Sequence, residues 1–304
     1  MTKFQLFCVT LLFGAVGSVV AGTSSEIQPS PVPSPEEQNS RDIFNYETTY
    51  TLSSDFRDDD NGRLGHSDSV YDDFSYNHRF LITGNWYFRA GAEYERFDFG
   101  GTDNGLPDHL QTAHAQFAIE YVVHDHAGLS LEINPGVYFQ NRVSWDAFDI
   151  PVKAFVSFPL KKDKIFGVIG AGGSIYQWPP VAPGGGLIWL FTDSLRLEGV
   201  FPKPALVYNP TDEWEFRLLA DLLFESFRTD DVLTTEKKIQ LHNAVLQYSE
   251  ERGGIQAGYS GFKPFEITVG AGCTFEREFD FYRADRRVYS DPAPYVRLSI
   301  GARF

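Results

Sequence analysis

The chain has 304 residues, a formal net charge of −15 and an aromatic content of 15%. Such an acidic chain repels phosphate backbones, which argues against nucleic acid as a partner. The mean hydropathy is mildly negative, which excludes a helical membrane protein. A membrane β-barrel can be this polar, because only every second residue of each strand faces lipid.

The first 21 residues have the features of a secretory signal peptide. Lys3 supplies the positive charge, residues 4–16 form an apolar segment, and residues 19–21 supply a cleavage site. A run of about 18 apolar residues, which a transmembrane helix requires, occurs nowhere in the chain. Cleavage of the signal peptide would leave Cys273 as the only cysteine, so no intramolecular disulfide could form.

Residues 22–42 are rich in Pro, Ser and Glu and carry few apolar side chains. This composition predicts a disordered, partly polyproline-like periplasmic tether. Binding to a cell-wall partner is an alternative role, but a plain spacer is commoner for such a composition. Residues 43–304 are then left for one folded domain.

Beyond residue 43, apolar and polar residues alternate with the period of a half-buried strand. In the final segment, for example, Leu298 and Ile300 fall on one face, and Arg297 and Ser299 fall on the other. The pattern predicts about fourteen strands, or twelve if one hairpin among the three shortest runs is absent. The predicted strands are residues 44–53, 74–82, 86–95, 113–123, 129–139, 150–160, 165–176, 185–191, 195–201, 205–208, 214–227, 239–259, 265–279 and 294–304.

The connections between these strands indicate which face points inward. Alternate connections are short turns, at residues 83–85, 124–126, 161–164, 192–194, 210–213 and 261–263. The others are mostly long, at residues 55–72, 98–109, 141–149, 177–184, 228–238 and 280–292, and only residues 202–204 break the rule. Short periplasmic turns opposite long extracellular loops are typical of outer-membrane barrels. The sequence therefore predicts an all-β, antiparallel transmembrane barrel in the bacterial outer membrane.

The chain ends on an aromatic residue, Phe304, with no polar tail after the last strand. This end resembles the closing strand of bacterial outer-membrane barrels, in which a terminal Phe is the assembly signal. The resemblance implies outer-membrane lipid and the barrel-assembly machinery as partners. The sequence does not indicate an oligomeric state.

Two further segments resemble a known family. Residues 186–221 contain F-P-K-P at Phe201–Pro204, then L-V-Y and D-E-W, and residues 270–280 and 293–304 complete the C-terminal part. These motifs resemble a family of uncharacterised bacterial outer-membrane barrels, catalogued as a domain of unknown function. The likeness covers most of residues 44–304. It implies fold and location only, since the family has no established reaction, substrate or functional residues.

Charged residues occupy the faces of the strands expected to point into the lumen. Opposite charges on neighbouring strands can pair and stiffen the wall, or can line a water-filled pore. We therefore expect a passive, porin-like channel for small polar or cationic solutes. A non-conducting structural or adhesive barrel, plugged by its own salt bridges, is the alternative. The candidate pore-lining residues are Glu93, Glu95, Glu120, Glu132, Glu215, Asp221, Arg79, Arg89, Lys153, Arg217 and Arg297; Glu47, Glu225, Glu266, Glu276 and Arg303 are expected on the same faces.

Enzymatic and metal-binding readings have weaker support in the sequence. An outer-membrane hydrolase would need a Ser–His–acid constellation, and no spacing links its candidates, His114, His242, Ser144, Ser157 and Ser174. The turn at residues 124–126 (His-Asp-His) offers at most two ligands of the roughly four that a closed site needs. The acidic loop at residues 55–62 lacks the Glu of an EF-hand and is expected to be solvated, with weak Ca²⁺ binding as the alternative. We expect no enzyme, no cofactor and no metal site.

Overall fold

The computed structural model describes residues 41–59, 62–100, 106–122, 128–230, 232–233 and 240–304. The expected signal peptide, nearly all of the expected tether and the turn at residues 124–126 lie outside the described residues. Within the described part of the chain, no helix is long and apolar enough to cross a membrane.

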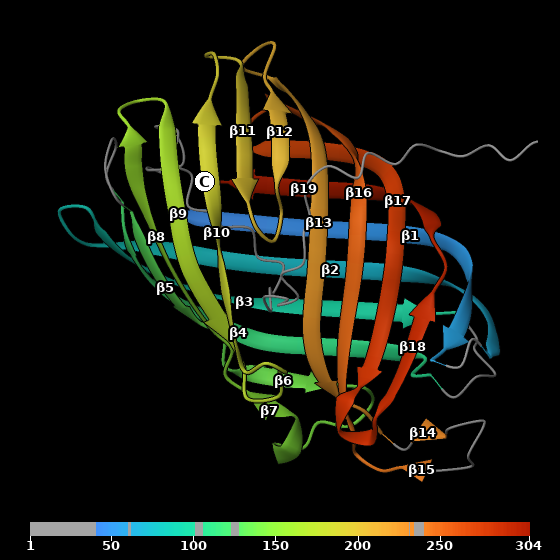
Figure 1. Cartoon of the computed structure of the whole chain (residues 1–304). Coiled ribbons are helices and arrows are strands. Elements are labelled where there is room, and N and C mark those ends of the chain that lie inside the picture. The colour runs from blue at the N-terminus through green and yellow to red at the C-terminus, as the bar shows by residue number, and fades with distance from the viewer. Residues whose placement is uncertain (1–40, 60–61, 101–105, 123–127, 231, 234–239) are drawn as a thin grey trace, which may run out of the picture.

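The chain forms a closed antiparallel β-barrel of fourteen wall strands (Figure 1). The barrel closes between the first and last strands, in register from Ile43 opposite Arg303 to Thr51 opposite Tyr295. The separate pair β14–β15 lies outside the wall. The strands are β1 (Asp42–Asp58), β2 (Arg63–Thr83), β3 (Trp86–Phe99), β4 (His109–Tyr121), β5 (Leu129–Ile133), β6 (Gly136–Phe139), β7 (Phe148–Asp149), β8 (Val152–Lys161), β9 (Ile165–Gly173), β10 (Val181–Leu190), β11 (Leu195–Val200), β12 (Ala205–Tyr208), β13 (Trp214–Arg228), β14 (Val232–Leu233), β15 (Gln240–Leu241), β16 (Val245–Phe262), β17 (Phe265–Phe281), β18 (Arg286–Ser290) and β19 (Ala293–Arg303).

Three of the fourteen wall strands are interrupted, and each interruption contains a proline. Pro135 separates β5 from β6, Pro151 separates β7 from β8, and Pro292 separates β18 from β19. Proline has no N–H to donate to a strand ladder, so it breaks the hydrogen bonding locally.

The structure confirms the predicted all-β barrel, with fourteen wall strands rather than twelve.

The side chains show which face of the wall meets lipid. Large apolar residues such as Phe44, Tyr50 and Ile267 are exposed, whereas Thr49 and Thr51, which alternate with them, are buried. A soluble barrel would show the opposite arrangement, with apolar residues inside. The wall is therefore apolar outside and polar inside, as the bilayer requires.

This arrangement reverses toward the extracellular end of the barrel. On β1, the register shifts between Thr51 and Ser54, and the next inward residue beyond Ser54 is the fully buried Phe56. On β17, a similar shift follows Thr274, so that Phe279 and Phe281 point inward. A β-bulge adds one residue to a strand and moves every later side chain to the other face.

The reversal corrects three sequence-based expectations. Glu276 was expected in the lumen but is exposed, because the bulge on β17 turns it outward. Residues 55–72 and 280–292 were expected to be long loops. They are largely strand, in β1, β2, β17 and β18, so only residues 59–62 and 282–285 remain as connections. The sequence analysis looked for strands whose apolar side chains face outward. It therefore missed the strand segments whose apolar side chains face inward.

The extracellular end is also narrower than the periplasmic end. Strands β9 to β12 are short, and beyond them β6 pairs directly with β13 through Phe139 and Arg228. The N–H of Gln140 donates to the carbonyl oxygen of Arg228 at 3.0 Å. The wall therefore closes over fewer strands there, and less space remains inside it.

The last residue extends the closing strand pair. The N–H of Phe304 donates to the carbonyl oxygen of Asp42 at 2.9 Å, and the Phe304 residue is 63% exposed. Phe304 therefore lies at the periplasmic rim, accessible to another protein. Its role as the assembly signal stays a prediction.

Single cysteines should test the sidedness of the barrel. In a Cys273→Ser background, Trp145→Cys should react with a membrane-impermeant maleimide on intact cells, because Trp145 is 90% exposed in an extracellular connection. Lys162→Cys, in the exposed turn between β8 and β9, should react only after the outer membrane is permeabilised. Labelling of Lys162→Cys on intact cells would reverse the topology.

Deletion of Phe304 should test the assembly signal. An exposed aromatic terminus is costly in water unless a receptor or lipid covers it. We expect the deletion to reduce the amount of heat-modifiable barrel in outer-membrane fractions, while export to the periplasm continues. Deletion of the exposed residue Trp145, far from the rim, serves as the control and should leave insertion unchanged. Normal insertion without Phe304 would contradict the assignment.

Candidate functional site

The interior of the barrel holds a cavity at its periplasmic end. The cavity has a volume of about 170 Å³. Its lining runs from rim residues such as Ile43 and Arg303 to the deeper Asp221 and Lys203. Most of its lining side chains are polar or charged, including Glu47, Glu215, Arg217, Gln256, Glu266 and Arg297.

Ion pairs that cross the lumen form the inner end of this cavity. Arg297 on β19 donates to Asp221 on β13 at 2.9 Å, although β16 and β17 separate these strands in the wall. A second nitrogen of Arg297 lies 3.1 Å from Glu47. Lys203, from the F-P-K-P segment, lies 4.0 Å from the other oxygen of Asp221. The family-like motif thus brings a cation into the lumen.

A second network surrounds Arg89, whose side chain is 0% exposed. Its guanidinium donates to Glu120 at 3.0 Å, to Glu132 at 2.6 Å and to Asn77 at 3.1 Å. Arg79 lies 3.0 Å from Glu120, and Lys153 lies 3.7 Å from Glu132. Burying these charges is tolerable because each one faces a partner.

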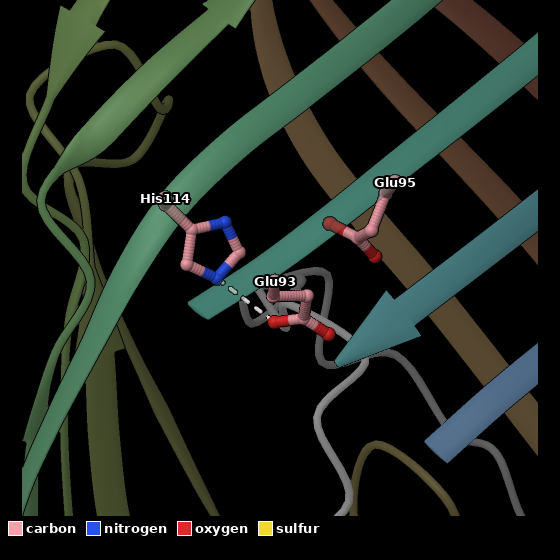
Figure 2. A group of neighbouring side chains, drawn as sticks. All are labelled: Glu93, Glu95 and His114. Atoms are coloured by element: carbon pink, nitrogen blue, oxygen red, sulfur yellow. Dashed lines mark ion pairs between the residues drawn. The ribbon is translucent and has the colours of Figure 1, made fainter. Parts of the chain in front are cut away.

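A third group of side chains is mostly acidic. Glu93 and Glu95 project from β3 and His114 from β4, and Figure 2 shows the three side chains pointing toward one another. The His114 Nε2 atom lies 2.8 Å from a Glu93 oxygen. Asp73 of β2 stands directly opposite Glu95 in the ladder. We call Asp73, Glu93, Glu95, His114 and Glu225 the acidic cluster; all five are buried.

An aromatic core fills the extracellular part of the lumen. It contains the buried residues Phe56, Tyr71, Phe97, Phe99, Leu106, Leu110, Tyr138, Leu223, Phe227, Leu246, Tyr248, Phe279, Phe281 and Val288. The rings pack edge-on, for example Phe99 against Phe279 at 5.0 Å between centroids. Among the described residues, these rings fill the part of the lumen between the charged layer and the extracellular end at the density of a protein core.

All eleven candidate pore-lining residues lie on the inward face, in two groups. Seven are buried: Glu93, Glu95, Glu120, Glu132, Asp221, Arg89 and Arg297. The other four are half-buried: Arg79, Lys153, Glu215 and Arg217. Of the eleven candidates, only Glu215, Arg217, Asp221 and Arg297 line the cavity.

Sequence reasoning missed several interior residues. Asp73 fell between the expected loop at residues 55–72 and the expected strand at residues 74–82, and Lys203 fell in the turn that broke the pattern of connections. The buried pair Arg252–Glu250, at 2.7 Å, lies on a predicted strand and was findable from the alternation. Arg277 was hidden by the bulge on β17. It donates across the lumen to Ser54 and Ser69 at 2.6 and 2.8 Å.

The hydrolase candidates are not brought together around His114. The His114 ring pairs with Glu93 and stacks on Tyr138. Ser157 accepts the N–H of Gly128, and Ser174 bonds to Asp149. In the acidic loop at residues 55–62, which was expected to be solvated, Asp55 pairs with Arg63, and residues 60–61 lie outside the described part of the chain.

Comparison with known proteins supports the fold. No protein-family model matches the sequence, and no curated protein matches it. An outer-membrane channel from Pseudomonas putida F1 is similar at 8% identity and a TM-score of 0.50, over 92% of this chain and 100% of that one. The toluene transporter TodX from Pseudomonas putida is similar at 9% identity and a TM-score of 0.39, over 94% of this chain and 94% of that one. LpxR from Salmonella typhimurium is similar at 12% identity and a TM-score of 0.40, over 86% of this chain and 100% of that one. The protein is an outer-membrane β-barrel; the resemblance to the uncharacterised family stays a prediction.

Removal of Arg89 should destabilise the barrel strongly. The change Arg89→Leu leaves Glu120 and Glu132 buried with fewer counter-charges, which typically costs about 3–5 kcal/mol. We expect a correspondingly lower urea midpoint for the refolded protein in detergent micelles. As a control, Arg57→Leu breaks the exposed pair of Arg57 with Asp291 and should cost at most about 1 kcal/mol. Equal effects of the two changes would contradict a dry, paired interior.

Proposed function

We propose that the protein is a channel for small polar or cationic solutes, and that the structure describes it in a closed conformation. The observation that carries the proposal is the cavity that enters the barrel from its periplasmic end. Its charged and polar lining continues inward to Asp221 and Arg297. Charged side chains then continue the inward face from this cavity to the aromatic core, as a hydrated pathway would require.

Closure in this conformation has two physical causes. The buried ion pairs of Arg89 and Arg297 occupy the middle of the lumen. Beyond them, the aromatic core blocks the narrow extracellular end. Conduction would therefore require the rings of the core to move, with the charged layer then exposed to water.

A non-conducting structural barrel is the second candidate function. The observation that favours it is the complete burial of Arg89 and Arg277, the two largest fully buried side chains. Fully paired, dry charges stiffen a wall without serving a solute. The solved channel from Pseudomonas putida F1 shares the fold at 8% identity, so it supports the channel at the level of architecture.

Widening the aromatic core should distinguish the two candidates. The double change Phe97→Ala and Phe279→Ala removes two inward rings, which pack through Tyr248 and Phe99. In planar bilayers we expect the wild-type protein to open rarely and the double variant to conduct steadily. The conductance should favour cations, because acidic residues face the same lumen and act within about 8 Å at physiological salt.

The outward-facing Phe275 provides the matched control. It lies on β17, as Phe279 does, but it is 48% exposed on the lipid-facing side. Phe275→Ala should therefore leave the conductance at the wild-type level. A double variant that is correctly folded, by heat-modifiable mobility, and still never conducts would defeat the channel and leave the structural barrel.

A further inference from the structure

The acidic cluster differs from the rest of the charged interior, because its carboxylates face one another. Asp73 stands opposite Glu95, and Glu93 stands opposite His114 in the strand ladders. Like charges directly opposite each other destabilise a sheet. The cationic side chain that acts on Glu93 and Glu225 is Lys153, which is also engaged by Glu132.

Glu225 provides a second and independent observation. It reaches the cluster from β13, on another part of the wall, and is only 3% exposed. Its carboxylate lies against Glu95 and near Glu93. Among the described residues, no amide, hydroxyl or cationic group donates to either of its oxygens, which face the carboxyl group of Glu95 instead. A buried carboxylate without a donor is costly, and a bound cation removes that cost.

Other atoms of the cluster also lack donors. One oxygen of Glu93 and the Nδ1 atom of His114 are buried without a hydrogen-bond partner in the described part of the chain. The other atoms are held in place: Tyr71 and Thr112 donate to Glu95 at 2.8 and 3.0 Å. These contacts fix the Glu95 carboxylate, while Glu225 and one oxygen of Glu93 face the cluster without a donor.

The spacing of the groups suits a single ion. Ligand atoms of Glu93, Glu95 and His114 all lie within 4.8 Å of one another. Ligands bound at about 2.1 Å to one ion can be separated by at most about 4.2 Å. Side-chain shifts of a few tenths of an ångström would therefore complete the site.

We propose that the acidic cluster binds one divalent transition-metal ion, through Glu93, Glu95 and His114, with Glu225 as a further ligand. Two carboxylates neutralise a divalent ion, and the imidazole favours a transition metal over Ca²⁺ or Mg²⁺. The cluster lies near the inner end of the periplasmic cavity. Asp73 lies within range of the charges of Glu47 and Lys203, and both of these residues line the cavity.

The test uses the mature protein refolded in detergent, with ZnCl₂ and MnCl₂ as probes and CaCl₂ for comparison. We expect isothermal titration to show one Zn²⁺ per chain, and Zn²⁺ to raise the melting temperature. The near-isosteric Glu225→Gln should weaken binding at least tenfold, and His114→Gln should weaken it further. Glu266→Gln, a carboxylate of the cavity outside the cluster, should bind as the wild type does.

The outcomes separate this site from the proposed channel, because binding is measured without conduction. If the protein binds Zn²⁺ but does not conduct, the proposed metal site stands and the proposed channel function is rejected. Wild-type protein that binds no ion, or whose melting temperature ignores all three ions, would overturn the proposal, since the carboxyl groups would then hold protons instead. Binding that Glu225→Gln and His114→Gln both leave unchanged would place the ion elsewhere and would also overturn it.

Discussion

A charge inside this barrel is costly unless it finds a partner there. Strand alternation sends half of the side chains into a lumen that protein and lipid surround, and an unpaired charge there is costly. Arg297 therefore bonds across the lumen to Asp221, and Arg277 bonds across it to Ser54 and Ser69. These contacts join strands that are not neighbours in the wall. The bonding of buried charges thus links strands two or three places apart along the inner face of the wall.

The extracellular end of the barrel is surrounded by water and not by lipid. Strands such as β2, with 21 residues, exceed the roughly 9–11 that span a bilayer. Where the strands leave lipid, the favourable arrangement becomes that of a soluble barrel, with apolar residues inside. On β1 and β17 a bulge makes this change, whereas β3 keeps its register and replaces inward Glu93 and Glu95 by Phe97 and Phe99. The aromatic core is the consequence.

The alternation of apolar and polar residues predicted the features that depend on a single strand. It missed the contacts between strands that are not neighbours. Period-2 patterns identified the barrel, the fourteen strands and all eleven inward candidate residues, since each depends on a single strand. Bulges defeat the same pattern: Glu276 was placed inside, and Arg277 and Phe279 were not recognised there. Contacts between strands that are not neighbours in the wall, such as Arg297 with Asp221, depend on the shape of the closed barrel. No spacing along the chain encodes that shape directly.

The acidic cluster and the aromatic core share residues, so the charged interior and the closure of the lumen are joined physically. Tyr71 belongs to the core and donates to Glu95 in the cluster. Tyr138 belongs to the core and stacks on His114. Glu225 lies between Leu223 and Phe227 on the inward face of β13, and both of those residues pack in the core. The acidic cluster is therefore coupled to the aromatic core through direct side-chain contacts inside the lumen, and not only through the strands of the wall.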